Sequence, residues 1–411
     1  MLLRKFYLVI APGLVKLGEH ELQEKWPLIL GQLKNRSLEN SLTQVKWQVF
    51  QDGIELYDVP LLIGCYLNLY LKIPTRILLR VKEFRCRDFP KLFKKTCKID
   101  WDEYLVSPNI KCHVAAHKSR LMHHKRLSAT LTDGIRKYFS AKQGRDKGFC
   151  EDIAADVYLR LNEDNCVISI NTSGEALYKR YPDKKVGKAP IRENLAAALL
   201  LFMQNHLKDR GLAENLPASL LDPMAGSGTF LLEAKHYWQA HVRKDYTFCS
   251  FPAIKKDVGS RIFQDPVMLK AANLFHSYFA YDCEDSVVEI ARENLASSHI
   301  EITKNDLFKD VPEQIGSGPR LVIVNPPYGV RLKIAQEKQH YFRKIVSRII
   351  STWRPEVIGI LLPQQANSYK LAARSDYKMV AKMNCINGGL KMTFFLLGKT
   401  SSVYSMPKSK F

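Results

Sequence analysis

The tetrapeptide Asn-Pro-Pro-Tyr at residues 325–328 combines residue types that can act on an amino group. Proline restricts its own φ and keeps the preceding residue extended, so the Asn325 side-chain oxygen and the Pro326 carbonyl oxygen can face one point. These acceptors can take both hydrogens of an exocyclic base amine, which frees its nitrogen lone pair to attack a sulfonium methyl group. Tyr328 offers a flat face on which an extruded base can stack. We expect Asn325, Pro326, Pro327 and Tyr328 to be the catalytic residues.

A proline-rich surface turn is the alternative interpretation of this motif, and it predicts no buried strand just before the prolines. Residues 321–324 are Leu-Val-Ile-Val, a short apolar run that is typical of a buried strand. We therefore expect the motif at the end of a core strand.

A glycine loop, Asp-Pro-Met-Ala-Gly-Ser-Gly-Thr at residues 222–229, follows two leucines of an expected strand. Gly226 and Gly228 allow a sharp turn, and the helix that follows would offer free N–H groups to an anion such as an amino-acid carboxylate. A carboxylate buried at Asp222 would need a partner, which a cation-bearing ligand supplies. No Gly-Lys-Ser/Thr follows, and Leu231 replaces a third glycine, so neither a Walker A loop nor a dinucleotide fingerprint is present. The predicted cofactor-binding residues of the loop are Asp222, Pro223, Gly226, Ser227, Gly228 and Thr229.

Two aspartates follow at the ends of the next expected strands. Asp282 ends Phe-Ala-Tyr-Asp at residues 279–282, where a carboxylate can accept both hydroxyls of a ribose; capping of the next helix is the alternative. Asp306 lies beside Leu307 in Lys-Asn-Asp-Leu, where its carboxylate could accept the N6 amine of adenine. We predict that Asp282, Asp306 and Leu307, together with Asn325, also bind the cofactor.

The elements that position these motifs alternate between strand and helix over residues 186–411. This alternation predicts a doubly wound α/β sheet that binds its ligand at the carboxyl ends of the strands, and residues 377–383 and 390–397 are expected to close it as an antiparallel hairpin. Residues 241–266 lack a clear period and are expected to be an insertion. Residues 1–70 read as an α+β unit, and residues 71–185 as a basic folded region.

The charge of the chain indicates a polyanionic partner. The sequence has 62 Lys and Arg against 41 Asp and Glu, a net charge of +21. Residues 72–147 alone hold 20 basic and 7 acidic residues. Such clustering favours nucleic acid over a general role in solubility.

Cysteine and histidine usage indicates neither a metal site nor a disulfide framework. Nine cysteines form no Cys-x-x-Cys pair, and the adjacent pair His123-His124 is poorly spaced for one ion. We expect a reducing, cytoplasmic compartment. No run of about 18 apolar residues is present, so we expect no membrane span.

The four motifs, in this order at strand ends, resemble class I S-adenosylmethionine (SAM)-dependent methyltransferases that act on amino groups. The resemblance covers residues 186–411 and implies a Rossmann-like fold with SAM as cofactor. It implies that Asp222, Gly226 and Gly228 line the methionine part of SAM, that Asp282 binds its ribose and Asp306 its adenine amine, and that Asn325, Pro326 and Tyr328 hold the base.

Further segments resemble the bacterial THUMP-domain rRNA guanine-N2 methyltransferases, as in the N-terminal half of the bifunctional 23S rRNA guanine methyltransferase. They are Gly-Glu-Ala-Leu-Tyr-Lys-Arg at 174–180, the stretch 188–199, and the basic stretch 117–124, which is similar to part of the RNA-binding THUMP fold. The resemblance places Arg192 and Glu193 near the cofactor. One departure is Tyr-Pro-Asp at 181–183, where relatives often carry a glycine, and it bears on the geometry of the linker.

The resemblance also predicts the domain organisation: a ferredoxin-like domain at 1–70, a THUMP domain at 71–172, a linker at 173–190 and the methyltransferase domain at 191–411. The expected RNA-binding residues are Lys118, Arg120, His123, Lys125, Arg126 and Arg331. The expected function is formation of N2-methylguanosine in large-subunit (23S) rRNA by a monomer.

Three alternatives remain open from the sequence. A tRNA guanine-N2 methyltransferase would use the same modules. An adenine-N6 or cytosine-N4 DNA methyltransferase would share the Asn-Pro-Pro-Tyr motif, although the basic N-terminal half favours RNA. A non-catalytic RNA-binding assembly factor would carry an inactive cofactor site, whereas all four motifs are intact.

Overall fold

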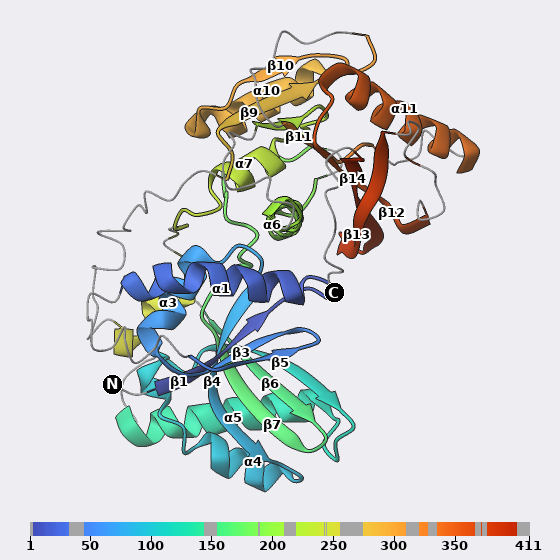
Figure 1. The fold of residues 1–411 in the computed structure, drawn as a ribbon. Helices are drawn as coiled ribbons and strands as arrows, with labels where there is room; N and C mark the ends of the chain where they lie inside the picture. Colours follow the sequence, from blue (N-terminus) through green and yellow to red (C-terminus); the bar gives the residue numbers. More distant parts are fainter. Residues whose placement is uncertain are drawn as a thin grey trace. The chain divides into compact units, whose positions relative to one another are not determined.

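A computed structural model describes residues 3–32, 45–143, 154–187, 190–208, 219–241, 243, 245–254, 274–309, 320–327, 335–365, 371 and 376–400. The chain divides into two compact units (Figure 1). Unit 1 comprises Met1–Ala11, Glu19–Arg180 and Ala240–Leu269, and unit 2 comprises Pro12–Gly18, Tyr181–Gln239 and Lys270–Phe411.

Unit 1 is built on a seven-stranded sheet of order β2-β3-β1-β4-β7-β6-β5, in which β5 and β6 are parallel and the other pairs antiparallel. The strands are β1 (Leu3–Val9), β2 (Trp47–Phe50), β3 (Gly53–Pro60), β4 (Arg76–Arg85), β5 (Ile110–His117), β6 (Ala155–Asn162) and β7 (Asn165–Asn171). The helices are α1 (Val15–Gly31), which begins in unit 2, α3 (Leu61–Tyr70), α4 (Phe89–Thr96), α5 (His124–Gln143), and the 3-10 turns η1 (Trp101–Glu103) and η2 (Thr247–Ser250).

The sheet of unit 1 runs across the domain boundary predicted at residue 70, because β4 pairs with both β1 and β7. A buried ion pair holds the chain at that boundary. The Lys25 ammonium lies 2.6 Å from a Glu21 carboxylate oxygen and also donates to the Tyr70 carbonyl oxygen, and the same carboxylate accepts the backbone N–H groups of Lys72 and Ile73. Both charges are fully buried but hydrogen-bonded, as burial of charge requires.

Unit 2 contains a second seven-stranded sheet, of order β10-β9-β8-β11-β12-β14-β13. The five strands from β10 to β12 are parallel, and β14 is antiparallel to both β12 and β13. The strands are β8 (Ser219–Asp222), β9 (Ser277–Asp282), β10 (Ile302–Lys304), β11 (Arg320–Val324), β12 (Val357–Pro363), β13 (Tyr377–Asn387) and β14 (Leu390–Lys399). The helices are α6 (Glu193–Lys208), α7 (Thr229–Lys235), α10 (Asp285–Leu295), the 3-10 turn η3 (Ala296–Ser298) and α11 (Ala335–Trp353).

Helices cover both faces of this sheet. Successive residues of a strand point to opposite faces. On β12, Ile358 and Ile360 join the apolar cluster that contains the α11 residues Ile345 and Ile349. A Cβ on Gly359, which points to the opposite face, would lie against Phe394 of the neighbouring strand β14 and Met203 of α6. The predicted doubly wound α/β fold with a C-terminal antiparallel hairpin is therefore confirmed.

The order of the strands reverses at β8, which has β9 on one side and β11 on the other. The crevice at such a reversal, outside the carboxyl ends of the strands, is where open α/β sheets bind their ligands. The glycine loop follows β8 and the Asn-Pro-Pro segment follows β11, so the topology brings two distant motifs to one edge.

Candidate active site

The glycine loop turns because two of its residues adopt a left-handed backbone. Gly226 and Gly228 have φ values of 56° and 78°, which other residues rarely adopt. A Cβ on Gly228 would approach the Leu295 side chain to 3.0 Å, so this glycine lets α10 pack closely. A Cβ on Gly226 would meet nothing within 4 Å, so the surface there is open among the described residues.

Asp282 connects three of the predicted cofactor segments. One carboxylate oxygen accepts the Gly226 N–H at 3.0 Å, and the other accepts the Glu284 N–H at 3.2 Å. Its backbone oxygen accepts the Asn305 N–H at 2.9 Å, next to Asp306. The residue that caps α10 is Glu284. Asp282 therefore points toward the glycine loop at the end of β9.

Asp306 is bound within its own loop. Its carboxylate accepts the Phe308 N–H at 2.9 Å and lies 3.2 Å from the Lys309 ammonium, and these contacts hold the pKa of Asp306 below its usual range despite partial burial. To accept a hydrogen bond from an adenine amine, an Asp306 carboxylate oxygen would therefore have to keep its present partner and accept a second donor. Leu307 is buried in the apolar cluster that also contains Val324 and Phe342.

Asn325 presents a buried side-chain oxygen that accepts no hydrogen bond from any residue described by the structure. The residues before it, from Leu321 to Val324, are at most 1% exposed, which confirms the buried strand expected before the prolines. Pro326 is buried and Pro327 exposed, while Tyr328 and Arg331 lie outside the described residues. A buried acceptor without a donor costs about 1–3 kcal/mol. Asn325 thus carries a cost that a bound donor would remove.

Lys184 is a site residue that the sequence did not indicate. Its ammonium donates to the Glu193 carboxylate at 2.6 Å and to the Thr229 hydroxyl at 2.7 Å, and its side chain is only 4% exposed. It therefore joins the starts of α6 and α7. The neighbouring Arg192 is exposed. Nothing in the basic linker around Lys184 distinguishes this lysine from those nearby.

Asn294 of α10 likewise escaped the sequence analysis. Its amide group donates to the Ser227 carbonyl oxygen at 3.0 Å and exchanges two hydrogen bonds with the backbone of Lys185. It therefore fixes the glycine loop and the linker against the same helix.

Asp222 is a buried carboxyl group beside which no countercharge lies among the described residues. It is 1% exposed, and burial raises the pKa of this carboxyl group to about 8, with the charge of Asp282 acting in the same direction and the Met224 N–H opposing it. A nearby cation would reverse the shift. The side chain therefore fits the ammonium group of a ligand.

The raised pKa of Asp222 predicts how stability varies with pH. Between about pH 4 and pH 8 the folded carboxyl keeps a proton that the unfolded one has lost, so stability should fall as the pH rises and level off above about pH 8. The slope is at most about 1.4 kcal/mol per pH unit. The melting temperature of Asp222→Asn, which still accepts the Met224 N–H, should fall less over this window. If the melting temperatures of wild type and Asp222→Asn changed equally with pH, the raised pKa of Asp222 would be contradicted.

The predicted RNA-binding residues of unit 1 lie on and around the connection from β5 to α5. Lys118, Arg120, His123, Lys125 and Arg126 are all exposed. The Nδ1 atom of His123 accepts the Arg126 N–H at 3.1 Å, so one ring nitrogen serves the helix start.

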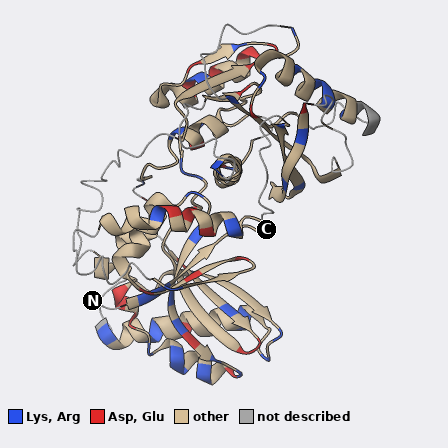
Figure 2. Ribbon diagram, viewed as in Figure 1, with Lys and Arg blue, Asp and Glu red and all other residues tan. Residues whose placement is uncertain are grey.

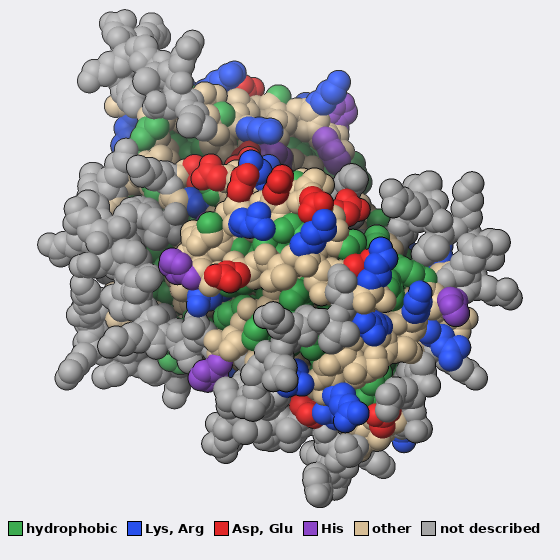
Figure 3. Space-filling view, turned by 90° about the horizontal axis from the view of Figure 1, so that it is seen from above, with side chains coloured by type: hydrophobic (Ala, Val, Ile, Leu, Met, Phe, Trp, Pro, Cys, Tyr) green, Lys and Arg blue, Asp and Glu red, His purple; other side chains and the backbone are tan. Residues whose placement is uncertain are grey.

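Helix α4 lies against α5 and adds further basic residues (Figure 2). The Arg126 guanidinium carbon lies 4.1 Å from the Phe89 ring centroid, which links the two helices. We call this the basic surface: Lys91, Lys94, Lys95, Lys118, Arg120, Lys125 and Arg126. In contrast, acidic and basic side chains are mixed on the face shown in Figure 3.

Two classes of feature are not found in the part of the chain that the structure describes. No helix there combines the length and apolarity needed to cross a bilayer. No three His, Cys, Asp or Glu side chains there gather into a group that could bind a metal ion.

The fold and this edge define an α/β methyltransferase: a parallel sheet with a glycine loop, an acidic residue at the next strand end and an Asn-Pro-Pro segment across the reversal. Residues 182–393 match the family described as RMKL-like, methyltransferase domain. The chain belongs to the RMKL-like methyltransferase-domain family.

Individual relatives agree with this assignment. The ribosomal RNA large subunit methyltransferase K/L of Marinomonas sp. (strain MWYL1) is 26% identical over 343 residues, which cover 79% of this chain but 45% of that protein. This chain thus spans about half the length of that relative. YpsC of Bacillus subtilis (strain 168), which carries the name of an RNA methyltransferase, is 26% identical over 84% of this chain and 88% of its own length.

A solved structure shares the whole fold. The crystal structure of a methyltransferase complexed with SAH has a TM-score of 0.72 and 23% identity, and the match covers 96% of this chain and 98% of that one. Both units of the chain therefore occur together in a known structure.

Proposed function

We propose that this protein is a SAM-dependent methyltransferase that forms N2-methylguanosine in large-subunit ribosomal RNA. The observation that carries the proposal is the buried oxygen of Asn325, which has no hydrogen-bond partner among the described residues and lies at the end of the strand that pairs with the glycine-loop strand. An acceptor in that place suits a target that brings its own hydrogens, as an exocyclic amine does.

The residues at the strand ends fit SAM. The buried Asp222 suits its ammonium group, the open backbone at Gly226 leaves space for the methionine part, and Asp282 can accept hydrogen bonds from ribose hydroxyls. Lys184 and Asn294 hold this surface in place. When bound, SAM supplies an electrophilic methyl group.

The chain's own contribution to the reaction is positioning and desolvation. Asn325 and the Pro326 carbonyl oxygen accept the two amine hydrogens and orient the lone pair, and Tyr328 stacks on the extruded base. The nitrogen forms a bond to the methyl carbon as the carbon–sulfur bond breaks. The methylated amine then loses one proton, and its acidity makes a strong general base unnecessary.

The RNA assignment is supported by the basic surface of unit 1 and by the names of the relatives. One relative is named for large-subunit ribosomal RNA and another for RNA in general. The net charge of +21 agrees with a polyanionic substrate.

The substrate is tested by mapping modified nucleotides by mass spectrometry in RNA from cells lacking this protein. Loss of N2-methylguanosine at a position in 23S rRNA is expected. The purified protein should methylate rRNA that lacks the modification. Methylation of tRNA or duplex DNA in its place would replace the proposed substrate, and absence of SAM binding in calorimetry would leave an RNA-binding assembly factor.

Charge reversal on the basic surface should weaken RNA binding and its dependence on salt. Each phosphate contact that is lost lowers the slope of log K against log salt concentration by about 0.7–0.9. We expect Arg120→Glu and Lys125→Glu each to reduce the slope by about this amount or more. Lys46→Glu, at an exposed site before β2, is the matched control. If the salt dependence of RNA binding were unchanged in both Arg120→Glu and Lys125→Glu, the RNA would bind outside the basic surface.

A further inference from the structure

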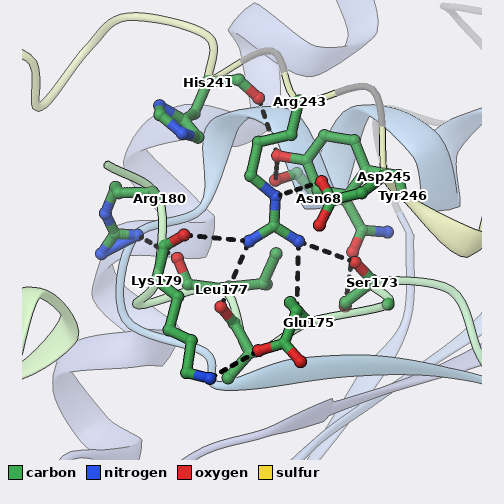
Figure 4. Close-up of polar contacts among 12 residues, drawn as sticks. Asn68, Ser173, Glu175, Leu177, Lys179, Arg180, His241, Arg243, Asp245 and Tyr246 are labelled. Carbon is green, nitrogen blue, oxygen red and sulfur yellow. Dashed lines mark hydrogen bonds and ion pairs between the residues drawn. The ribbon is translucent and has the colours of Figure 1, made fainter. Parts of the chain in front are cut away.

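A segment that lies between α7 and β9 in the sequence belongs to unit 1 rather than to unit 2. The chain leaves unit 1 after Arg180 and returns to it at Ala240. The described residues up to 254, with η2 among them, belong to unit 1, and Figure 4 shows the polar contacts around Arg243, Asp245 and Tyr246.

Arg243 in this segment donates hydrogen bonds to the last residues of unit 1 before the chain passes to unit 2. Its guanidinium donates to the carbonyl oxygens of Ser173 at 2.9 Å, Glu175 at 3.2 Å, and Ala176 and Lys179 at 3.3 Å each. Figure 4 shows the guanidinium surrounded by this stretch of backbone. These four carbonyl oxygens lie within seven consecutive residues. Arginine suits them because its planar guanidinium group carries several N–H donors in a fixed geometry, which no other side chain provides.

Neighbouring contacts hold Arg243 from the other side. Asp245 lies 3.0 Å from its Nε, and the Tyr246 ring centroid lies 4.7 Å from its guanidinium carbon. The Tyr246 hydroxyl donates to the His241 carbonyl oxygen at 2.7 Å, and the Phe248 N–H donates to the Thr172 carbonyl oxygen at 3.1 Å.

The outgoing and returning chains are attached to one short stretch of unit 1. Arg180 donates to the Lys72 carbonyl oxygen at 2.7 Å, and the His241 N–H donates to the Leu69 carbonyl oxygen at 2.7 Å. Arg180 is 2% exposed and Arg243 8%. Two guanidinium groups are therefore buried close together, and burial with the positive charges of Lys72, Arg180 and Arg243 lowers the pKa of His241 to about 2.

Burial of two guanidinium groups costs free energy, because charges that are removed from water need well-placed hydrogen-bond partners to compensate for the lost hydration. The partners of Arg243 are mostly backbone carbonyl groups of the outgoing chain. These hydrogen bonds therefore fix the path of the chain as it leaves unit 1. Attachment to unit 1 shortens the parts of the outgoing and returning chains that can move freely. Shorter and stiffer connections reduce the range of positions that two linked units sample and raise the effective concentration of one unit at the other.

We propose that Arg243 is a positioning residue for methyl transfer: it fixes the outgoing and returning chains on unit 1 and so limits where RNA held by unit 1 is presented to the active site of unit 2. The inference rests on the proposed function. It assigns Arg243 no contact with cofactor or RNA.

The test compares Arg243→Ala with the wild-type protein at saturating SAM and RNA. We expect the single-turnover rate of methyl transfer to fall about 10- to 100-fold, as loss of orientation predicts, while the Kd values for SAM and RNA change less than about 2-fold. Arg243→Lys, with fewer donors and no planar fork, should give an intermediate rate. Lys179→Ala removes only an exposed pair with Glu175 in the same stretch and should leave the rate unchanged.

Small-angle X-ray scattering on the full chain provides a readout that does not depend on activity. Arg243→Ala should show a larger maximum dimension and a broader distance distribution than wild type. An unchanged rate, identical scattering, or loss of RNA affinity together with unfolding of unit 1 would each overturn the inference. A wild-type protein that methylates no RNA would instead contradict the proposed function, and the scattering comparison would still test Arg243.

Discussion

Replacing Asn325 with alanine should lower the single-turnover rate of methyl transfer by at least about 10²–10³-fold, the usual effect of removing one positioned hydrogen-bonding group from an active site. The variant lacks the side-chain oxygen that would take one amine hydrogen, so the lone pair stays delocalised into the base. The Kd for SAM should change less than about 3-fold, because the other residues proposed to bind SAM lie at the ends of other strands. Quench-flow with labelled SAM measures the rate and calorimetry the affinity.

Stability provides a second readout for the same variant. Because the Asn325 oxygen is buried without a described donor, Asn325→Ala should melt at the same temperature as wild type or higher. Asn387→Ala, a buried asparagine on the β13–β14 hairpin, is the matched control and should keep the rate within about 3-fold. Equal losses of rate and SAM affinity in Asn325→Ala would contradict its role in holding the base.

Replacing Asp282 with alanine should weaken SAM binding by about 10²-fold or more, because hydrogen bonds to a charged group are worth about 1.5–3 kcal/mol each. Two are expected from the ribose hydroxyls. The change also removes the acceptors for the Gly226 and Glu284 N–H groups, which loosens the glycine loop. Calorimetric titration with SAM measures the loss.

Saturation separates this effect from a direct effect on chemistry. At high SAM concentration, the rate of Asp282→Ala should recover to within about 10-fold of wild type, so that KM rises more than kcat falls. Asp285→Ala, three residues further on, breaks an exposed pair with Lys304 and should leave the affinity unchanged. An unaltered Kd in Asp282→Ala would move the ribose site to another residue.

Much of the local structure could be predicted because it depends on neighbouring residues. The apolar stretch at 61–70 by itself indicates a buried helix, and α3 has these bounds. The basic stretch at 89–96 likewise indicates a helix, and it forms α4, whose N-cap Asp88 accepts the Lys91 N–H. The apolar run before the prolines is β11. Periodicity and chain-breaking residues act within a few positions, so they can be read directly.

The site was predicted as a set of motifs, and the structure shows which of them meet. Gly226, Asp282 and Asn305 are joined by hydrogen bonds, and the strand of Asn325 pairs with that of Asp222. The roles of these residues toward SAM and RNA remain predictions. The order of strands across a sheet depends on contacts between distant segments, which no local pattern encodes.

Lys184, Asn294 and Arg243 show where reading the sequence reached its limit. Each acts through a partner far away along the chain: Thr229, Ser227 and the carbonyl oxygens around Ser173. A lysine in a basic linker and an arginine in an irregular insertion resemble any other surface charge until folding buries them. The residue types and the short-range pattern define the methyltransferase chemistry, whereas the assignment of residues 240–254 to unit 1 follows from long-range packing, because burial depends on what the rest of the chain places around a residue.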